Sequence, residues 1–230
     1  MNVRITFPEA GKLRSRKVVS RSNARSTVKH PSWKMGRMIQ SESRHEHNAF
    51  MLLDASPSVI SYNEQPCILH YEMDGVSRRH YPDALVVTKL SKELWEIKER
   101  SDAESPEVAK RTALLTQVLP QHGYSYRVVL AEQLSIEPLL SNVKKLLMFG
   151  NKAVPLMAHE QIRQLFIKTG SIPWQVLIDG GLGKNYRYYV TRLILDGTLE
   201  INMNEPLTRL SLVKMSAAGA EDAIWLSLLT

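Results

Sequence analysis

The chain has 230 residues, 43% of them hydrophobic and 23% charged, with a formal net charge of +7 at pH 7. This length is enough for one large domain or two small ones, each with a packed core. No run of eighteen apolar residues is present, which excludes a transmembrane helix, and the basic N-terminus lacks the apolar segment of a secretory signal. The single cysteine, Cys67, cannot form an internal disulfide, which favours a reducing compartment such as the cytoplasm.

The positive charge is concentrated at the start of the chain. Residues 1–40 contain ten Lys or Arg residues and one acidic residue, Glu9, whereas the rest of the chain carries slightly more acids than bases. Such a segment is either a disordered basic tail or an arm that lies along a nucleic-acid backbone and becomes ordered on binding. The candidate DNA contacts in this basic N-terminal arm are Arg14, Arg16, Lys17, Arg21, Arg25, Lys34 and Arg37.

After the arm, residues 41–133 predict a helix, four strands, a second helix and a last strand. In chain order these elements span residues 41–54, 58–62, 66–73, 77–87, 93–100, 105–122 and 126–130. Asp74-Gly75 is a strong signal for a hairpin turn, and Pro106 and Gly123 mark the two ends of the second helix. Because that helix connects two strands, they are expected to run parallel, which gives an α/β core with a mixed sheet.

Polar residues within this core predict a metal site. Glu96 and Lys98 leave their strand on the same face, and Pro82 marks a strand start or bulge that places Asp83 beside them. Glu46 lies on the buried side of the first helix, where a carboxylate needs either a metal or an ion pair with Arg44 or Arg100. Carboxylate oxygens suit Mg²⁺, and an ammonium beside the metal orients an attacking water or offsets charge on phosphorus.

Residues 134–230 predict a second domain with the layout of a winged helix. Helical segments are followed by one helix of clear period at residues 184–196 and by two strands at residues 198–203 and 207–213. A major-groove interpretation gives Arg187 and Arg192 as DNA contacts, and the alternative is a protein-docking module with a solvated basic face. The apolar tail, with Trp225, Leu226 and Leu229, either folds back onto the core or binds a partner.

The order of these motifs resembles the restriction-endonuclease-like nuclease fold. More narrowly, the run from Ser43 to Phe50, then Leu53-Asp54, Pro57-Ser58-Val59 and Glu64-Gln65-Pro66, resembles TnsA, the endonuclease subunit of heteromeric cut-and-paste transposons. The resemblance covers about residues 30–130 and includes Trp33 to Arg37. It implies that Glu46, Asp83 and Glu96 are metal ligands and that Lys98 is the catalytic lysine. Some members of the family carry Gln in place of Glu96, and either residue supplies a side-chain oxygen.

The sequence therefore predicts a Mg²⁺-dependent endonuclease that cuts double-stranded DNA at transposon ends. A second ion about 3.5–4 Å from the first is expected while substrate is bound, with Mn²⁺ as a substitute metal. The resemblance implies a TnsB-type transposase that cuts the opposite strand, a TnsC-type ATPase regulator, and a bacterial cytoplasmic protein at the nucleoid, away from membranes. Two alternatives stay open: a non-catalytic DNA-binding recruitment protein, and a standalone restriction or repair nuclease.

Overall fold

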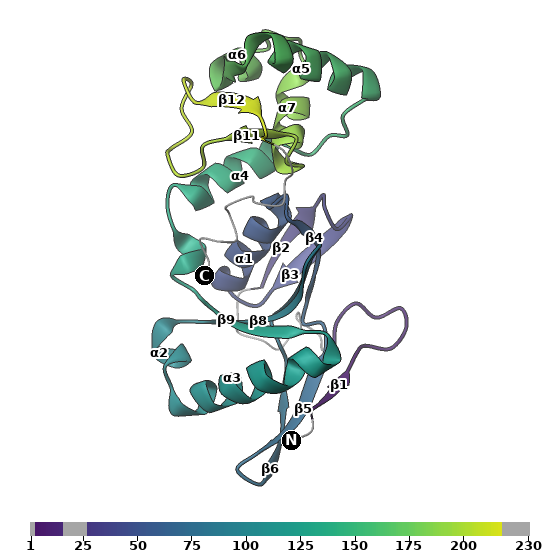
Figure 1. Cartoon of the computed structure of the whole chain (residues 1–230), viewed down its shortest axis with the longest axis vertical. Coiled ribbons are helices and arrows are strands. Elements are labelled where there is room, and N and C mark those ends of the chain that lie inside the picture. The colour runs from purple at the N-terminus through teal and green to yellow at the C-terminus, as the bar shows by residue number, and fades with distance from the viewer. Residues whose placement is uncertain (1–2, 16–26, 218–230) are drawn as a thin grey trace. The chain divides into compact units, whose positions relative to one another are not determined.

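The computed structural model describes residues 3–15 and 27–217, and the chain divides into two compact units (Figure 1). The first contains the described residues up to Asp54 together with Val59–Ser135, and the second contains Ala55–Ser58 and the described residues from Ile136 onward. No helix within the described ranges is long and apolar enough to cross a membrane. Some candidate residues lie outside the described ranges: Arg16, Lys17, Arg21, Arg25, Trp225, Leu226 and Leu229.

A four-stranded mixed sheet forms the centre of the first unit. Its order is β4 (Val59–Glu64), β7 (Ala84–Thr88), β8 (Lys92–Lys98) and β9 (Ser125–Leu130). β7 runs antiparallel to β4 and β8, whereas β9 runs parallel to β8. The chain passes from β8 to β9 through α2 (Arg100–Ala103), α3 (Pro106–Val118) and the 3₁₀ turn η1 (Leu119–His122). The parallel pair expected from the crossover helix is present.

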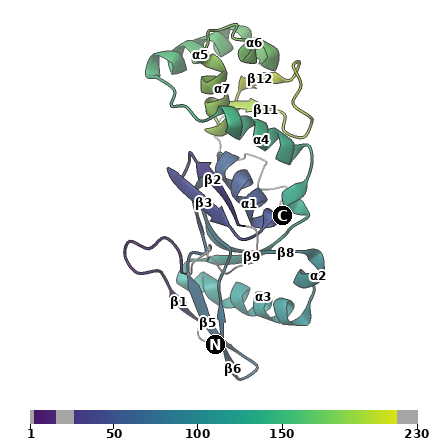
Figure 2. The same cartoon turned by 180° about the vertical axis from the view of Figure 1, so that it is seen from behind.

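Helices cover this sheet from two sides. Figures 1 and 2 show α1 (Arg44–Ala55) and α3 on opposite sides of β8 and β9. α1 buries Phe50 fully, and its ring stacks on that of Tyr62 in β4 with 5.7 Å between the ring centroids. α3 buries Leu115 in a cluster with residues of β5, β8 and β9. Burial of apolar surface on both sides fixes β8 as an interior strand.

A second sheet is formed by β1 (Arg4–Thr6), β5 (Ile68–Met73) and β6 (Val76–His80), with β5 in the middle. The single strand expected over residues 77–87 is therefore wrong: β6 pairs with β5, and β7 belongs to the four-stranded sheet. The chain changes sheets at Tyr81-Pro82, where the proline has no N–H to offer a ladder. The change places Asp83 immediately before β7.

Part of the basic N-terminal arm is a hairpin of β2 (Val28–Ser32) and β3 (Arg37–Ser41). Its alignment depends on a buried carboxylate in β4, because Glu64 Oε1 accepts hydrogen bonds from Arg37 Nη1 and from Arg14 Nε, both at 2.8 Å. Glu64 is 1% exposed. Burial alone would raise the pKa of Glu64, but the bonds from Arg37 and Arg14 outweigh it and lower the pKa.

The second unit combines four helices with a small sheet. After η2 (Gln133–Ser135) closes the first unit, its elements are α4 (Leu139–Phe149), α5 (Leu156–Thr169), β10 (Ser171–Pro173), α6 (Trp174–Ile178), α7 (Tyr186–Leu195), β11 (Leu199–Ile201) and β12 (Leu212–Met215). The sheet has three antiparallel strands in the order β10-β12-β11, where two were expected. The last strand begins at Leu212 because Asn142 in α4 holds the preceding loop: its amide donates to Met203 O and Glu205 O and accepts from Leu207 N.

Arg192 in α7 is buried, so the expectation that it lies on a solvent-exposed basic face is wrong. The side chain is 6% exposed, and its guanidinium donates to Gly150 O at 3.1 Å and to Asp196 Oδ1 at 2.7 Å. These bonds satisfy the C-terminal end of α4 and a carboxylate one turn further along α7. Arg187 instead lies half-buried over the ring of Tyr188, 4.6 Å from its centroid.

Cys67, the residue before β5, is fully buried in the apolar cluster beneath α3. Burial raises the pKa of its thiol to about 12, so the thiol is protonated at neutral pH. In guanidinium chloride the unfolded protein should react with Ellman's reagent and release one equivalent of the coloured thiolate. Over the same time we expect no reaction of the native protein. Rapid reaction of the native protein would contradict this packing.

Candidate active site

The four residues singled out as catalytic from the sequence line one hollow of about 800 Å³ in the first unit: Glu46, Asp83, Glu96 and Lys98. Glu46 comes from the first turn of α1, Asp83 from the residue before β7, and Glu96 and Lys98 from the end of β8. The structure thus brings together side chains that are up to 52 positions apart in the sequence.

Asp83 is held by its backbone between two strands. Its N–H donates to Trp95 O at 2.8 Å, and its carbonyl accepts from Gln65 N at 2.9 Å. The side chain turns back onto β8, where Oδ2 accepts from Ile97 N at 2.7 Å. Burial first, and then the charges of Glu96 and Glu46, raise the pKa of Asp83 well above its usual value. The carboxyl group of Asp83 is therefore both buried and close to the carboxylates of Glu96 and Glu46.

Glu96 is 3% exposed and lies among basic groups. Its Oε1 is 3.0 Å from Lys98 Nζ and 3.4 Å from Arg111 Nη2. Burial alone would raise the pKa of Glu96, but His80 and Lys98 outweigh it and lower the pKa. His80 Nε2 is 3.0 Å from Glu96 Oε2, and within the described ranges this buried oxygen accepts no hydrogen bond of normal geometry.

Glu46 is oriented by the start of its own helix. Ser43 Oγ accepts from Glu46 N at 3.1 Å, and Glu46 Oε2 accepts from Glu42 N at 2.8 Å. Ser43 thus caps the helix, and the spacing Ser43-x-x-Glu46 is that of a capping box, but the Glu46 carboxylate accepts from the N–H of Glu42, one residue before the cap. The carboxylate is 9% exposed and close enough to Asp83 to raise the pKa of that group.

Lys98 is half-buried at the rim of the hollow. Burial alone would lower its pKa, but the charge and the hydrogen bond of Glu96, followed by the charge of Asp83, outweigh it and raise the pKa. The amine is therefore protonated at neutral pH, which suits it to hold a water or a phosphate oxygen and not to act as a base.

Three further residues support Glu96 and were missed: His80, Arg111 and Tyr126. The Tyr126 hydroxyl is 3.0 Å from His80 Nε2, and Arg111 lies in the middle of α3, with its side chain 13% exposed. For Arg111 a signal was present, because it is a basic residue within an otherwise apolar helix surface. For His80 no signal was present, because its place depends on the sheet change at Tyr81-Pro82.

The donor set of this hollow fits a divalent metal ion. Its lining contains seven carboxylates against three Lys or Arg residues, so a DNA phosphate needs added positive charge to enter. Asp83 and Glu96 offer crowded carboxylates and one buried oxygen without a hydrogen bond, which suit a hard cation. Among the described residues no group of three or more His, Cys, Asp or Glu side chains is arranged to hold a metal. The fit is thus with two carboxylates, and Glu46 lies beside them.

The described candidates for DNA contacts in the arm have partners within the protein. Arg14 and Arg37 bind Glu64, and Lys34 Nζ donates to Val59 O at 2.7 Å. The contacts of Arg37 and Lys34 hold the hairpin to β4, and the contact of Arg14 holds an earlier segment of the arm to the same strand.

Comparison with known families adds to this geometry. Residues 56–130 match the family model described as TnsA-like endonuclease N terminal. This segment is TnsA-like. The match indicates a nuclease of the transposition type and confirms the resemblance to TnsA expected from the sequence. The TnsA-like segment includes Asp83, Glu96 and Lys98, whereas Glu46 precedes it.

Other comparisons add little to the TnsA-like match. No curated protein matches the chain. Among solved structures, the chain is similar to protein VC1899 from Vibrio cholerae, with 10% sequence identity and a TM-score of 0.24. The similar region covers 45% of this chain and 31% of that one. A similarity of this size has no bearing on fold or function.

Proposed function

We propose that the chain is a metal-dependent DNA endonuclease that cuts phosphodiester bonds at the ends of a transposon. The observation that supports this most is the meeting of Asp83, Glu96 and Lys98, all within the TnsA-like segment, in one acidic hollow. Glu96 and Lys98 both come from the end of β8, so the sheet holds these two side chains in a fixed relative position.

In this proposal Asp83 and Glu96 hold the metal, Mg²⁺ or Mn²⁺, and Glu46 supports the pair. When bound, the ion supplies Lewis-acid polarisation of the phosphate and an activated water, and a second ion is compatible with this chemistry. Lys98 holds the attacking water and offsets negative charge on the phosphoryl oxygens. Arg111 and His80 keep the Glu96 carboxylate in place, because they lie within 3.4 Å and 3.0 Å of its two oxygens.

The finer roles follow the TnsA resemblance. The chain would cut the strand at the 5′ ends, a TnsB-type transposase would cut the other, and a TnsC-type ATPase would regulate both in the cytoplasm, at the nucleoid. In the second unit, the order β10-α6-α7-β11-β12 around an antiparallel sheet suits a winged helix. Arg187 on α7 is then a candidate DNA contact, and the apolar tail with Trp225, Leu226 and Leu229 is a candidate partner contact.

Replacement of Lys98 by alanine is expected to lower the rate of strand cleavage by about 10²–10³-fold, since it removes a positioned cation from the transition state. The measurement is single-turnover cleavage of a transposon-end duplex in Mg²⁺ by the complex of the chain with its transposase partner. Binding of the chain to that complex, measured by co-purification, is expected to be unchanged. The matched control is Lys110→Ala, because Lys110 pairs with Asp74 at the surface and does not line the hollow.

Two results would replace the proposal with a rival. Equal cleavage by wild-type protein and by Lys98→Ala would remove the catalytic assignment and leave a recruitment protein. Cleavage of transposon ends by the purified chain alone, at the rate of the full complex, would favour a standalone nuclease.

A further inference from the structure

The sheet of β1, β5 and β6 buries one face and exposes the other (Figure 1). Its buried face contains Leu69 and Tyr71 of β5, which belong to the apolar cluster that includes residues of α3. Side chains alternate along a strand, so the residues on either side of these two lie on the opposite face. We call that opposite face the outer face, and its exposed and half-buried residues include Arg4, His70, Glu72, Ser77 and Arg79.

Three residues of the outer face form a row across the sheet. In the strand register Arg4 pairs with His70, and His70 pairs with Arg79. Neighbouring strands lie about 4.8 Å apart, so the row is about 10 Å long between the Cα atoms of the two arginines. Burial first, and then the charges of Arg4 and Arg79, lower the pKa of His70, as expected for an imidazole between two guanidinium groups. We call these three residues the basic row.

The arginines of the basic row are available to a ligand. Both are exposed, and in the part of the chain that the structure describes neither side chain has a hydrogen bond or an ion pair. Glu72 shares the outer face, but it lies opposite Ser77 and diagonal to Arg79, and it forms no ion pair with either arginine. Guanidinium groups without a carboxylate partner attract anions, and each can hold a phosphate through two parallel hydrogen bonds.

One end of the basic row lies at the acidic hollow. Arg79 lines that hollow together with Lys98 and Arg111. Lys98 and Arg111 are both bound to Glu96, whereas Arg79 has no carboxylate partner among the described residues. A ligand that lies along the row therefore reaches the rim of the hollow at the Arg79 end.

The spacing of the basic row fits a nucleic-acid backbone. One strand of a duplex carries a phosphate about every 3.4 Å along the axis, so a row about 10 Å long spans about three phosphates. Two cations at the ends of such a row contact two separate anionic groups more readily than one. His70 between them is neutral at pH 7, because its pKa is lowered, and its ring can donate a hydrogen bond to a phosphate oxygen.

We propose that the basic row binds the phosphodiester backbone of the substrate DNA where the DNA leaves the acidic hollow, with Arg79 nearest to the bond to be cut and Arg4 farthest from it. The inference rests on the proposed function for its ligand. It supplies positive charge beside a hollow whose lining has more carboxylates than Lys and Arg residues, and which a phosphate cannot enter without such charge.

The test compares two double variants that lose equal charge. Arg4→Gln with Arg79→Gln removes both charged ends of the basic row and is called the row variant. The control, Lys12→Gln with Lys92→Gln, removes two exposed lysines of the same unit, of which Lys12 pairs with Glu9 at the surface.

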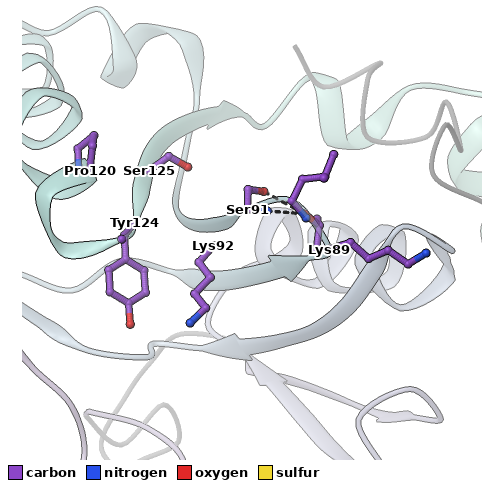
Figure 3. Close-up of a pocket in the computed structure, with 9 residues that line it drawn as sticks. Lys89, Ser91, Lys92, Pro120, Tyr124 and Ser125 are labelled. Carbon is purple, nitrogen blue, oxygen red and sulfur yellow. Dashed lines mark hydrogen bonds between the residues drawn. The ribbon is translucent and has the colours of Figure 1, made fainter.

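Lys92 suits the control because it lies at a different hollow. That hollow has a volume of about 460 Å³, and its lining includes Lys92 and Tyr124, whose amine and hydroxyl extend the same way in Figure 3. Lys92 begins β8, whereas Lys98 ends it. The control therefore removes a cation at the end of the strand that is remote from the acidic hollow.

Binding is measured by fluorescence anisotropy with each full-length protein and a fluorescein-labelled duplex about thirty base pairs long, in EDTA and at several KCl concentrations. We expect the row variant to lose affinity on the order of tenfold in about 0.1 M KCl, and its salt slope to fall by about two, because two phosphate contacts are removed. The control is expected to keep the wild-type slope. Arg4→Lys with Arg79→Lys keeps both charges and is also expected to keep that slope.

Three results in these titrations would overturn the proposal. They are equal slopes for the row variant and the control, a wild-type chain that binds no duplex at the lowest salt, and a reduced slope for the lysine variant. Poly-L-glutamate serves as a second probe. If the row variant loses binding to poly-L-glutamate but binds the duplex like wild type, the proposal is overturned in favour of an acidic protein as the ligand.

Cleavage distinguishes this inference from the proposed function. The titrations in EDTA require neither a metal nor a cut. In the partner complex with Mg²⁺, the row variant is expected to need about tenfold more DNA for half-maximal cleavage. A wild-type complex that binds but never cuts would refute the endonuclease and leave the binding result standing. A wild-type complex that cuts, with a row variant that binds like wild type, would refute the basic row alone.

Discussion

Replacement of Asp83 by asparagine is expected to abolish metal-dependent cleavage without loss of stability. The loss of rate should be about 10³-fold or more, since metal binding contributes several kcal/mol and each 1.4 kcal/mol or so is a factor of ten. Stability is spared because the pKa of Asp83 is raised, so at any pH above its unfolded pKa the charged form is less stable in the folded protein than in the unfolded chain. The amide removes that charge, and its oxygen can still accept from Ile97 N.

Two measurements check this expectation. Mn²⁺ titration by isothermal calorimetry is expected to show binding to wild type and none to Asp83→Asn, while the melting temperature of the variant in EDTA at pH 8 is equal or higher. Glu96→Gln serves as the contrast: it also loses cleavage, but it leaves Lys98, Arg111 and His80 without their carboxylate and lowers the melting temperature. A lower melting temperature for Asp83→Asn than for wild type would contradict the inference that the charge of Asp83 destabilises the folded protein.

Replacement of Glu64 by glutamine is expected to destabilise the protein by about 3 kcal/mol. Breaking a buried ion pair costs about 3–5 kcal/mol, and the lower end applies because the two arginines are 18% and 16% exposed and reach some water. The measurement is the free energy of unfolding from urea denaturation followed by circular dichroism. Glu9→Gln is the control, since Glu9 pairs with Lys12 at the surface and is 81% exposed.

The same variant has a defined pH dependence. The pKa of Glu64 is lowered in the folded protein, so its ionised form contributes stability above the unfolded pKa of about 4.3. That contribution is lost as the pH falls through the folded pKa. The difference in unfolding free energy between wild type and Glu64→Gln should therefore be largest at neutral pH and shrink below about pH 4. A difference that stayed constant down to pH 3 would assign the effect to packing.

The parts of the site that sequence reasoning reached are those set by local rules. Strand alternation put Glu96 and Lys98 on one face, and the crossover helix made β8 and β9 parallel. The parts that it missed depend on distant contacts. His80 meets Glu96 only because β6 and β7 lie in different sheets, and Arg192 is buried only because Gly150 and Asp196 take up its guanidinium.

Charge alone does not say what a basic residue contacts. Composition predicts nucleic-acid contacts for the arm, and within the protein Arg14 and Arg37 bind a single carboxylate in β4. A sequence gives no means to pair Glu64 with residues 50 and 27 positions away, because the pairing follows from tertiary packing. The orientation of Glu46 could have been predicted, because the spacing Ser43-x-x-Glu46 at a helix start is a local sequence signal.

The change of sheet at Tyr81-Pro82 separates the tip of the β5–β6 hairpin from the strand that follows Asp83. Because β5 and β6 pair with each other across the turn at Asp74-Gly75, and not with β7, the hairpin tip can grow or carry an insertion while Asp83 keeps both of its backbone bonds. A fluorophore or a crosslinker attached at that tip would move with the first unit and report its position in the complex that we propose.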